Sequence, residues 1–126
     1  MVIEYQIERI SPRGIPIHIL TLYKREARTT TIGSLWIVLR KKSKFAMIEE
    51  VSIKKQYRGL KHGKHLVNLA ESFIFSKGIR KVYIGSVGKS APFWKLLGYE
   101  CLGERSEFIR SLGVGGGPGF TWFKDL

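Results

Sequence analysis

The sequence predicts an α/β protein of the α+β kind, with a mostly antiparallel mixed sheet and helices on its faces. Residues 2–8 alternate between apolar and polar side chains, which is the period of a half-buried strand. Residues 66–74 carry an apolar stripe at helical spacing. Short apolar segments separated by glycines follow at 81–87 and 99–103. The order of these patterns indicates strands, then one long helix, then further strands.

Four strands are expected before the long helix. We place them at residues 2–8, 15–23, 29–39 and 45–53. The segment Ser11–Gly14 has the residues of a tight turn, because proline presets φ and glycine supplies a positive φ. The charged segment Arg40–Lys44 has the composition of a second turn. The four strands are therefore predicted to form two hairpins.

The second half of the chain begins with the long helix. Its stripe consists of residues spaced by three or four positions, namely Leu66, Leu69, Ala70 and Phe73. Gly78 is placed to end this helix. We then expect a strand at 81–87, a short helix at 91–97 and strands at 99–103 and 120–124. Residues 106–112 fit no single element, and the glycines of 113–119 predict a flexible loop.

Composition limits the classes of protein that fit. The length of 126 residues predicts a single domain, residues 1–126. Lys and Arg number 22 against 10 Asp and Glu, and the resulting charge of +12 favours anionic partners such as nucleic acid, an acidic protein or a phosphate-bearing cofactor. No apolar run is long enough to cross a membrane. With one cysteine and no signal-peptide pattern, we expect an intracellular, cytoplasmic protein.

The histidines give no metal site. His62 and His65 lie three residues apart on the expected helix, but no third ligand is evident, so we expect no bound metal. His18 lies on a strand of isoleucines and is expected to be structural.

The segment YRGLKHGKHL, residues 57–66, has the residues of an anion-binding turn. It joins a strand to the long helix, and the start of a helix offers unpaired N–H groups and a partial positive charge. Gly59 and Gly63 would let an anion approach the backbone closely, and Arg58, Lys61 and Lys64 add cations. By itself this pattern also fits a strand and helix joined by a solvated basic turn.

Residues 49–100 resemble the GNAT family of N-acetyltransferases. The resemblance rests on Ile53 five residues before Arg58, on the entry Tyr57-Arg58-Gly59 to the loop, and on the closing signature FWKLLGYE at 93–100. It implies the acyl-CoA N-acyltransferase fold and acetyl-CoA as co-substrate. It assigns the pyrophosphate to a loop of seven residues, Arg58, Gly59, Leu60, Lys61, His62, Gly63 and Lys64. It assigns the pantetheine arm and thioester to the strand end Val51, Ser52 and Ile53, and places Phe93 and Trp94 beside them.

The sequence departs from the family pattern at three places. Lys61 stands where the family has a glycine. It is strained if the position needs a positive φ, whereas with an ordinary φ its ammonium group could reach the phosphates. Trp94 stands where the family often has the tyrosine that protonates the leaving thiolate, and its indole N–H gives up no proton, so packing in the core is its expected use. No amphipathic helix fits between Ile10 and Thr31, so the usual N-terminal helices are expected to be missing.

A general base is needed if the acceptor is an amine, because an ammonium group cannot attack a thioester. Glu49 and Glu50 precede the cofactor strand end and are the candidates, with strand alternation expected to send them to opposite faces. The sequence does not choose between them, and either could instead be an exposed partner of nearby lysines.

The sequence therefore predicts an acetyl-CoA-dependent N-acetyltransferase that transfers acetyl to a primary amine, with a protein amine as one candidate acceptor. The alternative is a catalytically degenerate protein of this fold that binds nucleic acid or a protein partner through basic clusters at 40–44 and 54–64. A third hypothesis is a regulator that binds acyl-CoA without transfer. Open sheet edges are compatible with a homodimer.

Overall fold

The fold is described from a computed structural model that covers residues 2–59, 61–86, 90–104 and 120–126. The strands are β1 (Val2–Ile10), β2 (Ile17–Arg25), β3 (Thr29–Arg40), β4 (Phe45–Ile53), β5 (Lys81–Ser86), β6 (Glu100–Glu104) and β7 (Phe120–Asp125). The helices are α1 (His62–Ser76) and α2 (Ala91–Leu96), with single 3-10 turns at Pro12–Gly14 and Lys55–Tyr57. The unassigned segment 106–112, the loop predicted at 113–119 and the loop residue Leu60 lie outside the described residues.

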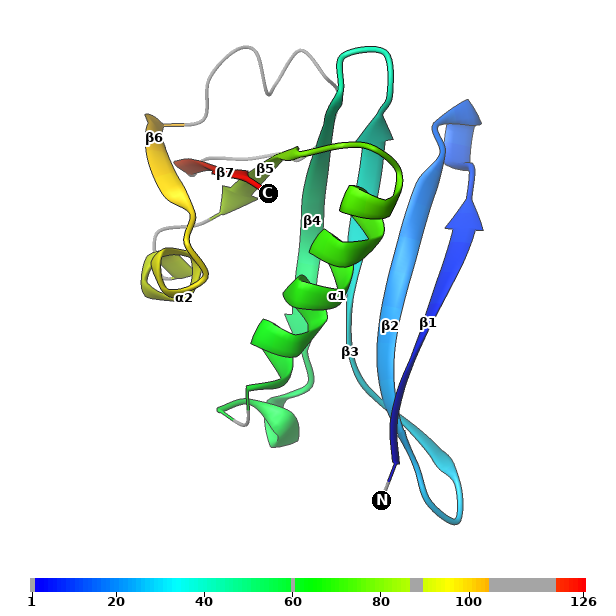
Figure 1. The fold of residues 1–126 in the computed structure, drawn as a ribbon. Coiled ribbons are helices and arrows are strands. Elements are labelled where there is room, and N and C mark those ends of the chain that lie inside the picture. Colours follow the sequence, from blue (N-terminus) through cyan, green and yellow to red (C-terminus); the bar gives the residue numbers. More distant parts are fainter. Residues whose placement is uncertain (1, 60, 87–89, 105–119) are drawn as a thin grey trace.

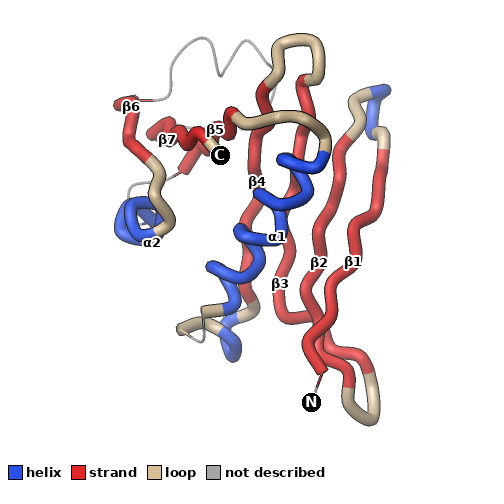
Figure 2. Tube along the Cα trace, viewed as in Figure 1, coloured by secondary structure: helices blue, strands red, loops and turns tan. Residues whose placement is uncertain are grey.

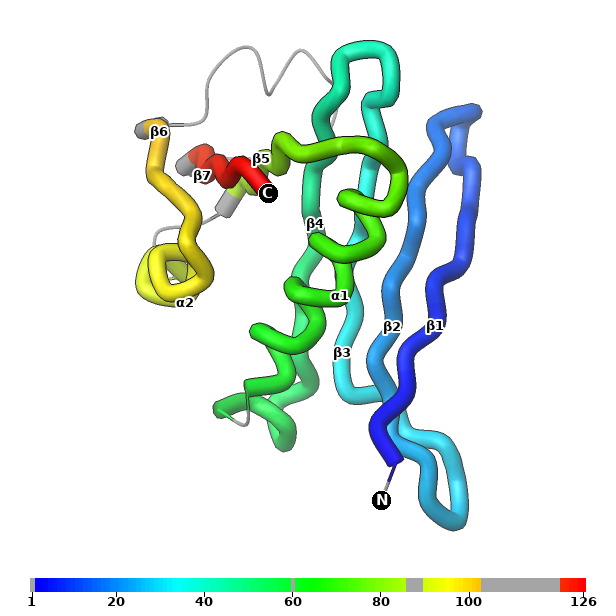
Figure 3. Tube along the Cα trace, viewed as in Figure 1, coloured from blue at the N-terminus to red at the C-terminus, as the bar shows by residue number. Residues whose placement is uncertain are grey.

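The seven strands of the described residues form one sheet in the order β1-β2-β3-β4-β5-β7-β6 (Figure 1). The two predicted hairpins are present, as the antiparallel pairs β1–β2 and β3–β4. β4 and β5 are parallel, and α1 connects them. β7 lies between β5 and β6 and is antiparallel to both (Figure 3). The predicted mixed, mostly antiparallel sheet is confirmed.

Helix α1 lies across one face of β2, β3 and β4 (Figure 2). Its buried residues are Leu66, Val67, Ala70 and Ile74. They pack against aliphatic residues of the sheet such as Leu20, Leu35 and Ile48. Each fully buried leucine, isoleucine or valine side chain stabilises the fold by about 1.5–3 kcal/mol. The helix stops where Gly78 adopts a φ of +79°, as its sequence predicts.

The other face of the sheet has its own apolar cluster, formed by Ile17, Val38, Phe45 and Met47. The family resemblance predicted that helices usual between the first two strands are missing here. The structure agrees, because only the 3-10 turn Pro12–Gly14 separates β1 from β2. Among the described helices, neither is long and apolar enough to span a bilayer.

Candidate functional site

The sheet opens between β4 and β5. Their parallel ladder runs from Phe45–Lys81 to Ile48–Ile84 and, within the described residues, goes no further. Beyond it β4 continues to Ile53 beside β3, while β5 continues beside β7. Alternate backbone N–H and C=O groups of Glu49–Ile53 therefore face the opening, where they can pair with an extended ligand as a neighbouring strand would.

A β-bulge lies at the point where the ladder ends. Trp36 of β3 is opposite Glu49, but Ser34 is opposite Ser52, so β4 has one extra residue in this interval. Glu50 takes up the extra length with a φ of +52°, a left-handed conformation that is costly for a residue other than glycine. The strict alternation that we expected for Glu49 and Glu50 is therefore wrong at this site, because the bulge interrupts it.

Gly33 lies opposite Ile53 and allows the two strands to approach closely beside the bulge. A β-carbon at this position would lie 2.5 Å from the carbonyl oxygen of Ser52 and 2.6 Å from Cδ1 of Ile53. Real side chains do not tolerate such distances, so the glycine is required for the path of β4 through Ser52 and Ile53.

The turn between β4 and α1 is held by backbone and side-chain hydrogen bonds. The backbone N–H of Lys54 donates to the carbonyl of Ile32 at 2.9 Å, and Nε of Arg58 donates to the carbonyl of Ile53 at 3.0 Å. Gly59 has a φ of +80°, with open space where its β-carbon would be. The guanidinium of Arg58 thus ties the loop entry to the strand end while remaining at the surface.

Helix α1 starts directly after Lys61, whose φ of 65° and ψ of 13° are left-handed. Of the two cases considered for Lys61, the structure has the strained one, which costs about 1 kcal/mol relative to glycine. The first helical bond runs from the N–H of His65 to the carbonyl of Lys61 at 3.1 Å. The N–H groups of His62, Gly63 and Lys64 precede it, have no partner within the helix and carry the positive end of the helix dipole.

Cations surround this helix start, and all of them are exposed: Lys54, Lys55, Arg58, Lys61 and Lys64. No acidic residue stands between Glu50 and Glu71 in the sequence. Free N–H groups, glycine at two positions and five uncompensated charges form the donor set that a diphosphate needs. The described loop residues therefore fit the role that the sequence predicted for them.

Phe93 and Trp94 of α2 occupy different environments. A β-carbon on Gly63 would lie 3.3 Å from Cζ of Phe93, so the ring of Phe93 packs directly against the start of α1. Trp94 is only 3% exposed and packs edge-on against Tyr99. Its Nε1 is buried without a hydrogen-bond partner in the described structure. Packing in the core, the expected use of Trp94, is what the structure has.

A polar cluster that sequence reasoning missed connects α1 to the end of the chain. The hydroxyl of Tyr99 donates to Glu71 at 2.7 Å, and Nζ of Lys124 lies 3.0 Å from the same carboxylate. Lys124 also donates to the carbonyl of Leu97 at 2.8 Å. Burial, the charge of Glu71 and the hydrogen bond to it raise the pKa of the Tyr99 hydroxyl well above its usual range. The cluster fixes α1 against β7 and the residues after α2.

The family of the chain follows from its sequence. The model of the acetyltransferase (GNAT) family matches residues 6–99. The chain belongs to the GNAT family. Acetyl-CoA is the co-substrate of this family. No curated protein gives a match.

Solved GNAT structures have the same fold at low sequence identity. A GNAT acetyltransferase of Staphylococcus aureus Mu50 is 16% identical, with a TM-score of 0.73 over 87% of this chain and 68% of that chain. An IAA acetyltransferase of Bacillus cereus is 14% identical, with a TM-score of 0.73 over 98% of this chain and all of that chain. A Bacillus anthracis protein assigned as a streptothricin acetyltransferase, solved with acetyl coenzyme A, is 17% identical, with a TM-score of 0.68 over 87% of this chain and 62% of that chain.

The two candidate bases lie next to each other but in different surroundings. Glu49 is half-buried and lies opposite Trp36, on the sheet face away from α1. Glu50 is exposed and forms the bulge. Both are at the level where β4 leaves β5. Among the described residues, no group of three or more potential metal ligands is present.

Proposed function

We propose that this GNAT protein is an N-acetyltransferase that uses acetyl-CoA to acetylate a primary amine. The observation that carries the proposal is the coincidence of two features at one end of α1. One is the edge of β4 from Glu50 to Ile53, beside which no described strand lies on the β5 side, and the other is the cationic, left-handed turn that opens α1. A linear ligand with an amide-containing arm and a diphosphate matches both features at once.

The residues that would hold acetyl-CoA are those of the two features. Backbone groups of Val51, Ser52 and Ile53 pair with the pantetheine amides, and the loop from Arg58 to Lys64 receives the pyrophosphate on its N–H groups. Phe93 covers the start of α1 from the side of α2. Acetyl-CoA supplies an activated acetyl group as a thioester. A backbone N–H near the bulge polarises the thioester carbonyl and stabilises the charge that develops on its oxygen.

Glu49 is the better candidate for the base. It is half-buried beside the bulge, whereas Glu50 is exposed and constrained by its left-handed backbone. Glu49 removes a proton from the acceptor ammonium, directly or through one water, so that the neutral amine attacks the thioester carbon. The C–N bond forms as the C–S bond breaks, and the second proton of the amine nitrogen passes to solvent. Trp94 gives the sulfur no proton. The CoA sulfur leaves as an unprotonated thiolate, because an alkyl thiol has a pKa of about 8.5.

The class of acceptor that we favour is a protein amine. Two features support it: the helices usual between β1 and β2 are absent, and the net charge is +12. An open acceptor side admits a chain segment, and the charge attracts an acidic one.

The free side of β1, which ends the sheet order, could also pair with a second copy, and sedimentation at several concentrations tests such a homodimer.

The first experiment is calorimetric titration of the purified protein with acetyl-CoA and with CoA at low and moderate salt. We expect binding in the micromolar range, and we expect Gly63→Glu to abolish it by placing a carboxylate among the free N–H groups. Ser72→Glu is the matched control, because it adds the same charge to an exposed position of α1 about 13 Å further along the helix. This variant should bind as the wild type does.

Either outcome is decisive for the cofactor site. Binding that survives in Ser72→Glu and is lost in Gly63→Glu supports the proposal and directs the search to acceptors. Absence of binding at both salt concentrations refutes it. Salt-dependent binding of nucleic acid in the same protein preparation, without CoA affinity, would favour the degenerate alternative.

A further inference from the structure

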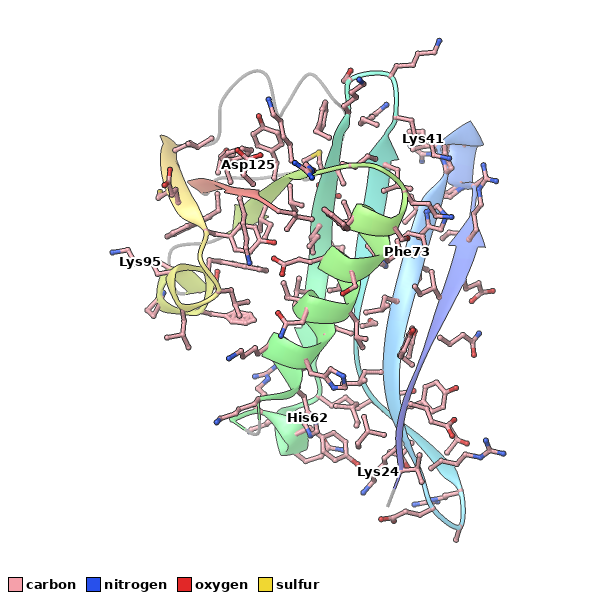
Figure 4. The ribbon with its side chains drawn as sticks, viewed as in Figure 1. Lys24, Lys41, His62, Phe73, Lys95 and Asp125 are labelled. Atoms are coloured by element: carbon pink, nitrogen blue, oxygen red, sulfur yellow. The ribbon has the colours of Figure 1, made fainter. Side chains whose placement is uncertain are left out.

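A second concave site lies at the end of α1 opposite the proposed cofactor loop. It is a cavity of about 600 Å³, bounded by the ends of β1 and β3, the start of β2, the β3–β4 turn and the residue after α1. Figure 4 labels Lys41 and Phe73 at this end of the molecule and His62 at the other. Helix α1 has 15 residues, so the two ends are about 22 Å apart.

The lining of this cavity is strongly cationic. Four of its described lining residues are exposed Lys or Arg and none is acidic: Arg9, Lys41, Lys42 and Lys77. They come from three separate parts of the chain and converge only in the folded protein. Like charges brought together in this way repel one another, and a bound anion relieves the repulsion.

His18 forms part of the floor of the cavity. The centre of its ring lies 5.0 Å from the centre of the Phe73 ring. The ammonium of Lys77 lies 5.3 Å from the centre of that Phe73 ring. Its Nδ1 is buried and has no hydrogen-bond partner within the described structure. Burial, followed by the charges of Arg9, Lys77 and Lys41, lowers the pKa of His18. The three cations thus add to the effect of burial in disfavouring the protonated form of the imidazole.

We propose that this cavity binds a compact ligand that carries several phosphate groups. A phosphate has up to two negative charges and a carboxylate has one, so two or three linked phosphates can match these four cations within a space of about 600 Å³. Arg9 can donate two parallel hydrogen bonds to a phosphate, and the lysines act as point charges. The carbonyl end of α1 is nearby and disfavours an anion, but its partial charge is about half a unit against the four full charges of the cations.

The test uses inorganic tripolyphosphate as the probe, titrated by calorimetry into protein saturated with CoA. If the proposed function is correct, CoA occupies the loop at the start of α1 and keeps tripolyphosphate out of it. If it is not correct, Gly63→Glu keeps tripolyphosphate out of that loop instead. The cavity is therefore tested independently of the proposed function. We expect binding in both backgrounds. The double variant Lys41→Gln/Lys77→Gln should weaken it about tenfold or more.

The matched control is Lys81→Gln/Lys95→Gln, which removes the same charge from two exposed lysines outside the cavity and should change affinity little. A second readout is the NMR titration of His18. Bound phosphate should raise the pKa of His18, because it offsets the charges of Arg9, Lys77 and Lys41. Equal loss of binding in both double variants, or an unmoved His18 at saturation, would overturn the proposal. Preference for an oligonucleotide or a poly-glutamate peptide over tripolyphosphate at this cavity would overturn it as well.

Discussion

The cluster of Tyr99, Glu71 and Lys124 makes a quantitative prediction for Tyr99→Phe. The hydroxyl of Tyr99 donates to a carboxylate at 2.7 Å, and the residue is only 3% exposed. A buried hydrogen bond to a charged group contributes about 1.5–3 kcal/mol. Glu71 keeps Lys124 at 3.0 Å in the variant, so we take the lower end. Tyr99→Phe should therefore lower the free energy of unfolding by about 1.5 kcal/mol at pH 7.

The same substitution should change the alkaline stability. The pKa of Tyr99 is raised in the folded protein, so above pH ~10 the unfolded chain loses this proton while the folded chain keeps it. The folded state then binds more protons, and stability falls with rising pH by up to about 1.4 kcal/mol per unit. The stability advantage of the wild type over Tyr99→Phe should thus shrink to near zero by pH ~11.

Denaturant unfolding followed by tryptophan fluorescence at pH 7, 10 and 11 measures both effects. Tyr5→Phe is the matched control, because Tyr5 is 53% exposed and should alter neither the stability nor its pH dependence. Parallel pH curves for the wild type and Tyr99→Phe would refute the reasoning, since they would mean that the Tyr99 proton is not held by the folded state.

Four further predictions concern single residues. Gly33→Ala should lower the free energy of unfolding by about 2–4 kcal/mol in denaturant titration, because its β-carbon would lie 2.5 Å from the carbonyl oxygen of Ser52. Lys61→Gly should raise thermal stability by about 0.5 kcal/mol, because it removes the left-handed strain and loses part of that gain to a freer unfolded chain. His18 has a lowered pKa in the folded state, so stability should fall as pH drops below ~6.5, and His18→Gln should flatten that part of the curve. Glu49→Gln should lower kcat for an identified amine about 100-fold with little change in the KM for acetyl-CoA, and an unchanged kcat would exclude Glu49 as the base.

Much of the fold could be predicted from local sequence patterns. Alternation at 2–8 and the stripe at Leu66–Phe73 gave a strand and a helix at the right places, because burial on one face imposes its period on the residues. The motif from Tyr57 to Gly63 located the loop that opens α1. These features depend on neighbours in sequence, and single-sequence reasoning can detect them.

The missed features depend on pairing between distant residues. The bulge at Glu50 arises because the register between β3 and β4 shifts from the pair Trp36–Glu49 to the pair Ser34–Ser52. No local sequence pattern predicts this shift. The bond between Tyr99 and Glu71 joins residues 28 positions apart in the chain. Lys61 was recognised as a departure from the family pattern, but its left-handed φ became visible only in the structure.

The position of β7 has a consequence for how the protein folds during synthesis. β5 pairs with β7 across the interval from Ser86 to Phe120, and β6 has β7 as its partner in the sheet. Until residue 125 has left the ribosome, β5 exposes a bare edge, and β6 has no partner among the described strands. The first four strands and α1 can form earlier, because their contacts lie within the first 76 residues. The part of the sheet formed by β5, β7 and β6, together with α2, is then completed last. This step is slow because a loop must close over a long stretch of chain.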